Sequence, residues 1–382
     1  MSRAKPLSCR GRASKWQLAG VLLLASVAAA RGGDLVVMHV APYSGAGATI
    51  AREYAEGARL YFDHVNAQGG VRGSRVRLVA RDDAGDPQRA GAEAMAAASE
   101  QPLAFIGAVG ADNVKRMMPA LEKLQAPLLG AVVDASGVSA TDHAYVFHVR
   151  PDLRQEVDAL AAELHALGMR KIALCAEDSI VARPADRPAD PAAATATATV
   201  IRCDGGAGEI AAAARAIAAT NAQAVIYAGP PAEAAAFVEA LRAGDSHAMI
   251  VTTSAVDAGR LVRMLPRAAR SWLAVAESVP NPRAGVHAAA APVVREFLAM
   301  REANGAQVAV SRESMAGFMT AKLAVEAIRR AGANPSSAGV RAALDDMDEF
   351  DLGGVKVGFQ RRERLPSYVT LGIVSSTGVI LN

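Results

Sequence analysis

From Leu35 onward, short runs of β-branched and apolar residues alternate with segments whose apolar residues recur every three or four positions. The first pair is the run Leu35–Val40 and a helical pattern that extends from Ile50 to Val65, before Gly69 and Gly70. Strands that alternate with helices are typical of right-handed βαβ crossovers, which build a parallel sheet with helices on both faces. The sequence therefore predicts an α/β fold with doubly wound parallel sheets.

The same pattern restarts after about residue 150, which predicts two α/β lobes of similar plan. For the first lobe we expect strands at Leu35–Val40, Val76–Ala80, Leu103–Ile106 and Pro127–Val133. For the second we expect strands at Lys171–Cys175, Ala198–Arg202, Ala224–Tyr227, Ala248–Thr252 and Trp272–Ala276. Helical patterns near residues 289–303, 313–331 and 336–347 follow, and three β-like runs end the chain: Val355–Phe359, Tyr368–Val374 and Val379–Leu381. A length of 382 residues agrees with two domains of about 100–200 residues each.

Residues 1–30 have the pattern of a secretory signal peptide. Five basic residues come first, namely Arg3, Lys5, Arg10, Arg12 and Lys15, and an apolar run from Leu18 to Ala30 follows them. The run is about 13 residues long, whereas a helix needs about 20 to span a bilayer. It ends in three alanines that a signal peptidase accepts, so we expect cleavage near Ala30 and export. An ordinary buried helix is the alternative.

Cleavage near Ala30 would also change the charge of the chain. It would remove five of 41 basic residues and no acidic residue, which takes the formal charge from +3 to about −2. A nearly neutral chain of this length is not a strongly basic nucleic-acid binder, so we expect no nucleic-acid partner. No later segment reaches about 18 uncharged apolar residues, and we therefore expect a soluble, exported protein.

Two cysteines, Cys175 and Cys203, remain after the predicted cleavage. Both lie in apolar, strand-like segments of a protein that we expect in an oxidising compartment. Two interpretations stay open: a disulfide between them, or two buried free thiols. We favour the free thiols.

Motifs for catalysis and for cofactors do not occur in the sequence. The dinucleotide fingerprint G-x-G-x-x-G begins at Gly45, but Ile50 stands where the third glycine belongs. Asp82 and Asp83 end the second expected strand, where an acid can bind a ribose, but a turn with a solvated acidic pair is the favoured interpretation. The seven histidines are scattered without metal-ligand spacing. We therefore expect no enzyme, no cofactor and no metal site.

Several short motifs, taken in order, are similar to those of a known family. They are Ala41-Pro42-Tyr43-Ser44-Gly45, Glu56-Gly57-Ala58, the run from Val65-Asn66 to Arg72-Gly73, Asp82-Asp83 before Asp86-Pro87, Gly229, the run Glu313 to Phe318, and Phe350-Asp351-Leu352-Gly353-Gly354. Their order and spacing resemble the leucine/isoleucine/valine-type (type I) periplasmic solute-binding proteins of ABC importers. The resemblance covers nearly all of residues 34–381.

The resemblance implies a clamshell, in which two doubly wound parallel-sheet lobes are joined by a hinge of several chain crossings. The ligand would lie between the lobes, at the carboxyl ends of the strands. We place crossings near Arg150, near Val279 and before the final strands. The signal peptide is then residues 1–30, lobe 1 is 31–150 plus about 280–354, and lobe 2 is 151–279 plus about 355–382.

The resemblance also implies a way of binding an amino acid. Small hydroxyl residues and helix N-termini would hold the carboxylate, an acid would hold the ammonium, and aromatic residues would close over the ligand. On this chain the hydroxyl positions correspond to Ala111 and about Asp134, the tyrosine to about Val181, and the acid to about Ser254. Asp112 and Asp134 near the mouth would repel a carboxylate, unless they serve as ordinary helix-capping residues.

We expect the cleft to contain Tyr43, Ser44, Ala111, Asp112, Val133, Asp134, Ile180, Ser254 and Glu277. The alternative for Tyr43 and Ser44 is that they only shape the first strand–helix turn. The alternative for Glu277, at the expected hinge, is a structural ion pair. Tyrosines 54, 61 and 227 are assigned to the core.

The resemblance implies an exported, monomeric solute-binding protein in the periplasm. It would capture a small polar molecule, amino-acid-like or a related organic acid or amide, for an ABC permease and ATPase complex in the inner membrane. The departures at the pocket positions predict that it does not hold a free branched-chain amino acid in the family's usual way. A periplasmic sensor that reports its ligand to a receptor or regulator is the alternative. The incomplete glycine pattern disfavours a secreted nucleotide-dependent oxidoreductase.

Overall fold

The computed structural model describes Met1 and residues 33–133, 144–177, 197–283, 291–359, 368–375, 377 and 379–381. For residues 197, 198 and 381 it describes the backbone alone. The chain divides into two units, Met1–Arg31 and Gly32–Asn382, and all described residues except Met1 belong to the second. The predicted signal peptide lies in the first unit, outside the described residues except for Met1. Across the described ranges, no helix combines the length and apolar character that a bilayer crossing requires.

The first lobe of the larger unit is built on a parallel sheet with the strand order β2-β1-β3-β4-β5. The strands are β1 (Leu35–Ala41), β2 (Val76–Asp82), β3 (Ala104–Ile106), β4 (Leu128–Leu129) and β5 (Val146–Phe147). Strand β1 is buried along its whole length because it lies between β2 and β3. The first three strands lie within two residues of the predicted ones, whereas the fourth is limited to Leu128–Leu129 of the predicted run Pro127–Val133. The fifth has only two residues and was not predicted.

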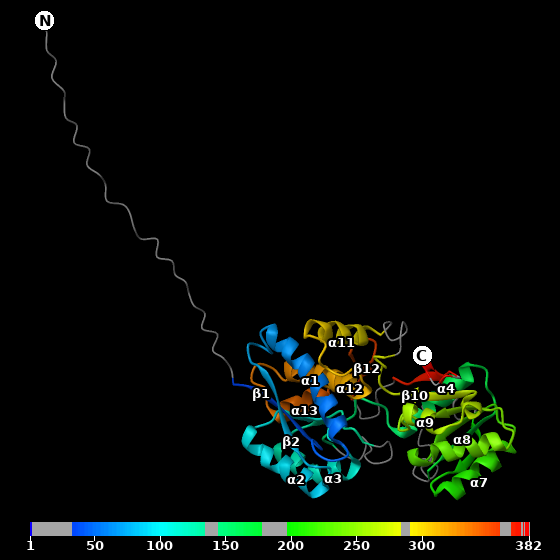
Figure 1. Ribbon diagram of the computed structural model, residues 1–382. Helices are drawn as coiled ribbons and strands as arrows, with labels where there is room; N and C mark the ends of the chain where they lie inside the picture. Colours follow the sequence, from blue (N-terminus) through cyan, green and yellow to red (C-terminus); the bar gives the residue numbers. More distant parts are fainter. Residues whose placement is uncertain are drawn as a thin grey trace. The chain divides into compact units, whose positions relative to one another are not determined.

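One face of this sheet is covered by helices from distant parts of the chain: α1 (Ala48–Ala67), α11 (Pro292–Ala303), α12 (Arg312–Arg330) and α13 (Ser337–Asp345). Helices α1 and α12 lie side by side in the centre of this layer (Figure 1). A Cβ atom at Gly57 of α1 would lie 1.8 Å from the Ser314 carbonyl oxygen, and one at Gly317 of α12 would lie 1.9 Å from the Tyr54 carbonyl oxygen. Only glycine allows the two backbones to approach this closely.

The other face is covered by α2 (Pro87–Ala96), the short 3₁₀ helix η1 (Ala97–Glu100) and α3 (Ala111–Leu124). Helix α2 begins as the sequence predicts. The Asp86 carboxylate accepts a hydrogen bond from the Arg89 amide, and Pro87 occupies the first helical turn. Helices on both faces give this lobe the predicted doubly wound plan.

The second lobe contains a sheet of order β14-β13-β10-β9-β8-β6-β7. Its strands are β6 (Ile172–Ala176), β7 (Thr197–Arg202), β8 (Ala224–Ala228), β9 (Met249–Thr252), β10 (Leu273–Glu277), β13 (Thr370–Val374) and β14 (Ile380–Leu381). The strands from β6 to β10 are parallel, whereas β13 and β14 add to the β10 edge in antiparallel fashion. The sheet is therefore mixed at one edge, where the last part of the chain joins it.

Helices cover both faces of the second sheet as well (Figure 1). They are α4 (Leu153–Ala166), α7 (Ala207–Ala218), α8 (Ala234–Ala243) and α9 (Ala258–Met264), with the 3₁₀ helices η2 (Pro231–Glu233) and η3 (Arg267–Arg270). Helix α4 packs with one hydrophobic cluster, and α7, α8 and α9 pack with the cluster on the opposite face. The core thus follows the same plan as in the first lobe.

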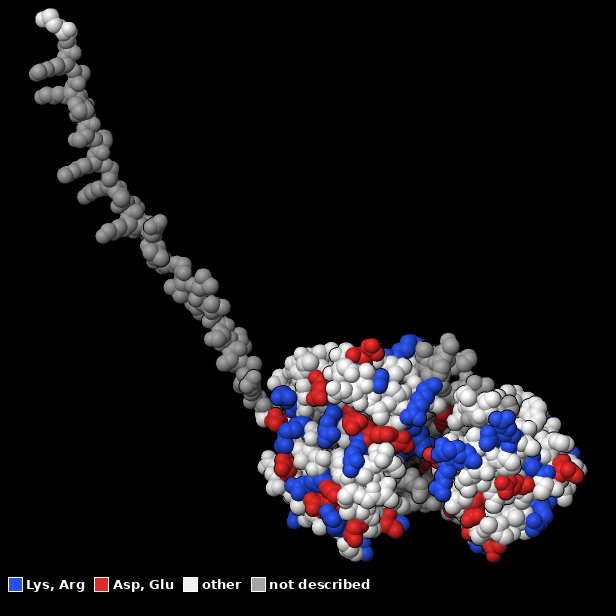
Figure 2. All heavy atoms as spheres, in the orientation of Figure 1, with Lys and Arg blue, Asp and Glu red and all other residues white. Residues whose placement is uncertain are grey.

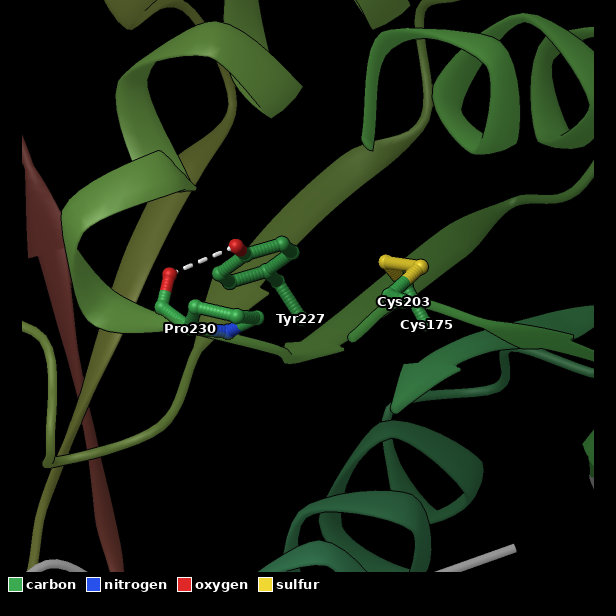
Figure 3. The surroundings of a disulfide bond; sticks show 4 residues. All are labelled: Cys175, Cys203, Tyr227 and Pro230. Atoms are coloured by element: carbon green, nitrogen blue, oxygen red, sulfur yellow. Dashed lines mark hydrogen bonds between the residues drawn. A yellow bond between two sulfur atoms is a disulfide. The ribbon is translucent and has the colours of Figure 1, made fainter. Parts of the chain in front are cut away.

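Cys175 of β6 and Cys203, just after β7, form a disulfide (Figure 3). Their Cα atoms are 5.4 Å apart, and both residues are buried. Strands β6 and β7 are neighbours in the sheet, so the ends of these strands bring the two cysteines together. The favoured interpretation of two free thiols was wrong. Beside the disulfide, the Tyr227 hydroxyl donates to the Pro230 carbonyl oxygen at 2.7 Å.

The chain passes between the lobes at several points. Val149 packs in the core of the first lobe and Leu153 in that of the second. After Glu277, the last residue of β10, Val279 packs again in the first core. Residues 355–359, which we assigned to the second lobe, contain β12 (Lys356–Val357), paired with β11 (Phe350–Asp351), and pack in the first core. The expected boundary near residue 355 therefore moves to a point after Phe359, whose ring meets that of Phe147 edge to face.

Candidate functional site

A cavity of about 580 Å³ lies between the two lobes. We call it the interlobe cavity. The first lobe contributes Thr49, Ile50, Glu53, Tyr54, Val109, Gly110, Ala131, Val132, Val133, His148, Arg312, Glu313 and Ala316. The crossing and the second lobe contribute Arg150, Pro151, Asp152, Glu156, Ser254, Ala255, Asp257 and Ser278. Many of these residues directly follow β3, β4, β5, β9 or β10, so the cavity lies at the carboxyl ends of the strands. The surface of this unit is hollowed where the lobes meet, and basic and acidic side chains surround the hollow (Figure 2).

Tyr54 forms part of the cavity wall although its side chain is fully buried. Its hydroxyl donates to the Gly130 carbonyl oxygen at 3.0 Å and lies 2.7 Å from the Thr320 hydroxyl. Gly107 and Gly130 have positive φ angles, and a Cβ atom on either would lie within 3 Å of Tyr54. The glycines after β3 and β4 therefore leave the space that this ring occupies. The assignment of Tyr54 to the core was right but incomplete.

His39 of β1 lies behind this wall, where its ring stacks on the Tyr54 ring. Its Nε2 atom is 3.1 Å from the Gly107 carbonyl oxygen, and its Nδ1 atom is 2.6 Å from the Tyr43 hydroxyl. Because a carbonyl oxygen only accepts, Nε2 carries the proton and Nδ1 accepts from Tyr43 in the neutral ring. Burial lowers the pKa of His39 to about 4, so the ring is neutral at physiological pH.

A buried carboxylate, that of Glu156 in α4, organises the second lobe's side of the cavity. It accepts hydrogen bonds from both the amide and the hydroxyl of Ser254, and the Ser278 hydroxyl donates to the Ser254 hydroxyl at 3.0 Å. Burial raises the pKa of the Glu156 carboxyl. The loop after β9 is thereby fixed against α4.

Arg312, the first residue of α12, reaches from the first lobe to this loop. Its Nη1 atom donates to the Ser254 carbonyl oxygen at 2.7 Å, and its Nε atom lies 3.6 Å from the Glu313 carboxylate. The helix is positioned by Ser311, which forms a capping box with Ser314. One arginine thus contacts the second lobe directly across the interlobe cavity.

Two of the acids in the wall cap helices. The Asp152 carboxylate accepts from the Gln155 amide at the start of α4, and the Asp257 carboxylate accepts from the Arg260 amide at the start of α9. The partial positive charge of a helix N-terminus offsets part of such a carboxylate's charge. These acids are therefore structural, and Glu53, Glu313, Arg150 and Arg312 carry the charge that a ligand would meet.

Of the predicted site residues, Val133 and Ser254 line the interlobe cavity. Asp134 and Ile180 lie outside the described residues, as does Val181. Glu277 is buried next to the cavity residue Ser278, and its carboxylate accepts a hydrogen bond from Asn281 at 2.6 Å. Asn281 is neutral, so this contact is a hydrogen bond and not the ion pair that we gave as the alternative for Glu277.

Tyr43 and Ser44 are not part of the cavity wall. The Asp82 carboxylate accepts hydrogen bonds from the amides of both residues and from the Ser44 hydroxyl, so this loop is tied to the end of β2. These bonds, the Ser44 hydroxyl first, lower the pKa of Asp82. The alternative that Tyr43 and Ser44 shape the strand–helix turn describes them better.

Asp83 departs from the expected solvated acidic pair. Its side chain is fully buried, and its carboxylate accepts from the Asn113 side-chain amide at 3.0 Å and from the Gly85 amide at 2.8 Å. Burial raises its pKa. Asp83 therefore joins β2 to α3 inside the first lobe.

Ala111 and Asp112 begin α3 beside the cavity residue Gly110, but neither lines the interlobe cavity. The Asp112 side chain is 78% exposed and lies 3.3 Å from the Lys115 ammonium. The Lys115 ammonium offsets part of the charge that we expected to repel a ligand carboxylate.

Three charged residues of the cavity wall, Arg150, Glu156 and Arg312, were not predicted as site residues from the sequence. Each comes from a different part of the chain, so no local motif unites them, although Arg150 was named as a crossing point. Among the described residues, no group of three or more His, Cys, Asp or Glu side chains is arranged to hold a metal ion.

Comparisons with known proteins agree with this architecture. A family model described as periplasmic binding protein matches residues 37–368. The structure of a substrate-binding periplasmic protein from Ralstonia solanacearum is 32% identical, with 91% of this chain and 99% of that chain covered and a TM-score of 0.67. An extracellular ligand-binding receptor from Verminephrobacter eiseniae is 26% identical, with 91% and 100% covered and a TM-score of 0.70. A Pseudomonas aeruginosa protein named amino acid binding protein is 37% identical over 57 residues, which is 15% of each chain.

The family match and the structural matches confirm the predicted resemblance and the clamshell fold of two α/β lobes. The family is one of periplasmic substrate-binding proteins and not of enzymes. With a family model over most of its length and an interlobe cavity at the carboxyl ends of two sheets, this chain belongs to the periplasmic binding proteins.

Proposed function

We propose that this protein is the solute-binding component of an ABC importer and closes its lobes around an amino-acid-like molecule or a related organic acid or amide. The observation that carries the proposal is the interlobe cavity, with residues from both lobes in its wall. Its volume of about 580 Å³ lies within the ~300–1,000 Å³ range of small-molecule sites. The name of the Pseudomonas relative supports an amino-acid-like ligand.

The ligand is not a free branched-chain amino acid bound in the usual way of the leucine-type proteins. Ala111 has no hydroxyl to offer a carboxylate, and it lies outside the cavity wall. In the described part of the wall, Tyr54 is the one aromatic residue apart from His148, and its hydroxyl is already bonded to Gly130 and Thr320. A wall with this many charged groups favours a ligand with polar substituents.

We further propose that residues 1–30 are removed near Ala30 and that the mature protein acts as a monomer in the periplasm. The basic, apolar and small-residue segments in that order support the cleavage. The ABC permease and ATPase complex in the inner membrane would receive the solute. N-terminal sequencing of protein exported by its host tests the cleavage, and an N-terminus before residue 25 or after residue 35 would contradict it.

A thermal-shift panel tests solute binding. We expect at least one member of a panel of amino acids, aromatic acids and amides to raise the melting temperature of the wild type. Ala255→Trp places an indole in the interlobe cavity and should abolish the shift. Ala212→Trp, on the exposed side of α7, is the matched control and should retain it. A shift that survives Ala255→Trp would place binding elsewhere.

Uptake of the compound found in this way separates the importer from the sensor. Cells that lack the protein should take up the compound more slowly, and the wild-type chain should restore uptake whereas Ala255→Trp should not. Binding without any effect on uptake would favour the sensor.

A further inference from the structure

One charged group in the interlobe cavity, that of Arg150, forms no ion pair with any described residue, although the charges of Glu313 and Glu156 act on it from farther away. Arg150 follows β5 where the chain crosses between the lobes, and its side chain is half-buried in the cavity wall. Within the described ranges its guanidinium makes no hydrogen bond and no ion pair. A guanidinium has five N–H donors and stays protonated in proteins. Partial burial of a charge without an ion-pair partner is unfavourable for folding. We therefore expect Arg150 to contact the ligand when one is bound.

The acids near Arg150 are committed to other groups. The Glu156 carboxylate accepts two hydrogen bonds from Ser254, and the Glu313 carboxylate lies 3.6 Å from the Arg312 guanidinium. The two helix-capping aspartates accept from backbone amides. Glu53 also faces the cavity. The charges of Glu313 and Glu156 stabilise the Arg150 guanidinium from a distance, but no carboxylate of the described residues forms an ion pair with it.

Arg312 adds a second positive charge on the same side of the cavity. Burial first, and the charge of Arg312 next, lower the pKa of the Arg150 guanidinium. An anion bound beside both arginines would offset the repulsion between their positive charges. The planar fork of a guanidinium fits a carboxylate with two parallel hydrogen bonds, which an amide or an ester does not match.

We propose that Arg150 binds the carboxylate group of the solute, so that the interlobe cavity selects carboxylic acids over their amides. This inference rests on the proposed function and names the ligand class of the same site. The family resemblance implied that small hydroxyl residues hold the ligand carboxylate. In this proposal the Arg150 guanidinium, at the crossing between the lobes, holds it instead. This assignment also accounts for a pocket in which the position of one such residue, Ala111, has no hydroxyl.

Matched pairs of acids and amides test the proposal. We suggest L-leucine with L-leucinamide, L-phenylalanine with its amide, benzoate with benzamide, and succinate with succinamide, measured by thermal shift and calorimetry on the full mature chain. At least one acid should bind while its amide does not. Arg150→Gln should weaken that acid's binding by about 30-fold or more, the usual loss when one partner of a desolvated charge pair is removed.

The ligand-free proteins provide the control for folding. Because Arg150→Gln removes a desolvated charge without a partner, the melting temperature of the ligand-free variant should be unchanged or higher. If Arg150 had a structural role, Arg150→Gln would lower this melting temperature. Arg150→Lys keeps the charge but loses the fork, and should bind with intermediate affinity. Arg215→Gln, on the exposed side of α7, should bind as the wild type does.

Three results would overturn the carboxylate assignment. An amide that binds as tightly as its acid, or an Arg150→Gln variant with wild-type affinity, would do so while the proposed solute-binding function stands. A panel in which no acid binds would also overturn it. If uncharged and cationic solutes also failed to bind, that result would contradict the proposed solute-binding function as well.

Discussion

A histidine buried neutral behind the cavity wall makes the stability of this protein depend on pH. Burial lowers the pKa of His39 to about 4 in the folded state, against 6.5 for the free side chain. In the folded protein the ring stays neutral as the pH falls, whereas in the unfolded chain it takes up a proton near pH 6.5. Its contribution to folding stability is therefore fully present above pH 6.5 and is lost as the pH falls towards 4.

The size of the effect follows from the shift. One pKa unit corresponds to about 1.4 kcal/mol, so the His39 contribution should fall by about 2 kcal/mol by pH 5 and by about 3 kcal/mol by pH 4. His39→Gln removes the titrating ring and isolates this contribution from those of the other groups. The variant should be less stable than the wild type at pH 8, and the difference should shrink by these amounts on acidification.

Urea unfolding of the wild type and His39→Gln at pH 8, 6.5, 5 and 4 measures the difference. His247→Gln, at an exposed histidine, is the matched control. A cost of His39→Gln that is the same at all four pH values would refute the reasoning. It would mean that His39 titrates alike in the folded and the unfolded chain.

Three further predictions concern packing, the disulfide and Glu156. Gly57→Ala should lower the free energy of unfolding in urea by about 2–3 kcal/mol, because the new Cβ atom would lie 1.8 Å from a backbone carbonyl oxygen. Gly208→Ala, with open space around it, is the control and should not destabilise the protein. Equal effects of the two substitutions would contradict the close approach of α1 and α12. Replacing Cys175 and Cys203 by serine should cost about 3–4 kcal/mol for a loop of 28 residues, and an unchanged unfolding curve would argue against the bond. Because burial raises the pKa of Glu156, the wild type should lose stability relative to Glu156→Gln as the pH rises from 4 to 8. A wild type that gains stability relative to the variant over this range would contradict the raised pKa.

The fold was predictable because its signals are local. The alternation of β-rich and helical segments predicted the strands from Leu35–Ala41 to Leu273–Glu277 within a residue or two, except that β4 ends four residues before the predicted Val133. The start of α2 at Asp86 and Pro87 was also readable, since a cap and a first-turn proline are neighbours in the sequence. The two-residue strand β5 was not predicted, whereas β4, equally short, lies within a longer apolar run.

The disulfide and the burial of Asp83 were not predictable in the same way. Cys175 and Cys203 are 28 residues apart, and only the pairing of β6 with β7 brings them together. Asp83 finds its partner in Asn113 of α3, on another element of the first lobe. In both cases the sequence contains the residues but not the contact.

The residues of the interlobe cavity were also only partly predictable, because they come from distant parts of the chain. The family resemblance points to the carboxyl ends of strands, and the loop residues Val133 and Ser254 named on that basis line the interlobe cavity. Arg150, Glu156 and Arg312 come from a crossing, a helix of the second lobe and a helix of the first, and only the folded chain assembles them. Asp112 follows the cavity residue Gly110 closely in the sequence, yet its side chain is exposed and does not line the cavity.

The central claim is that the interlobe cavity binds one small carboxylic acid through Arg150. Mass spectrometry of the intact protein, purified natively from its host, tests the claim most directly. We predict one bound small molecule per chain that is identified as a carboxylic acid after release, is retained by Arg215→Gln, and is absent from Arg150→Gln and from Ala255→Trp. A bound molecule without a carboxylate, or the same occupancy in Arg150→Gln, would contradict the account.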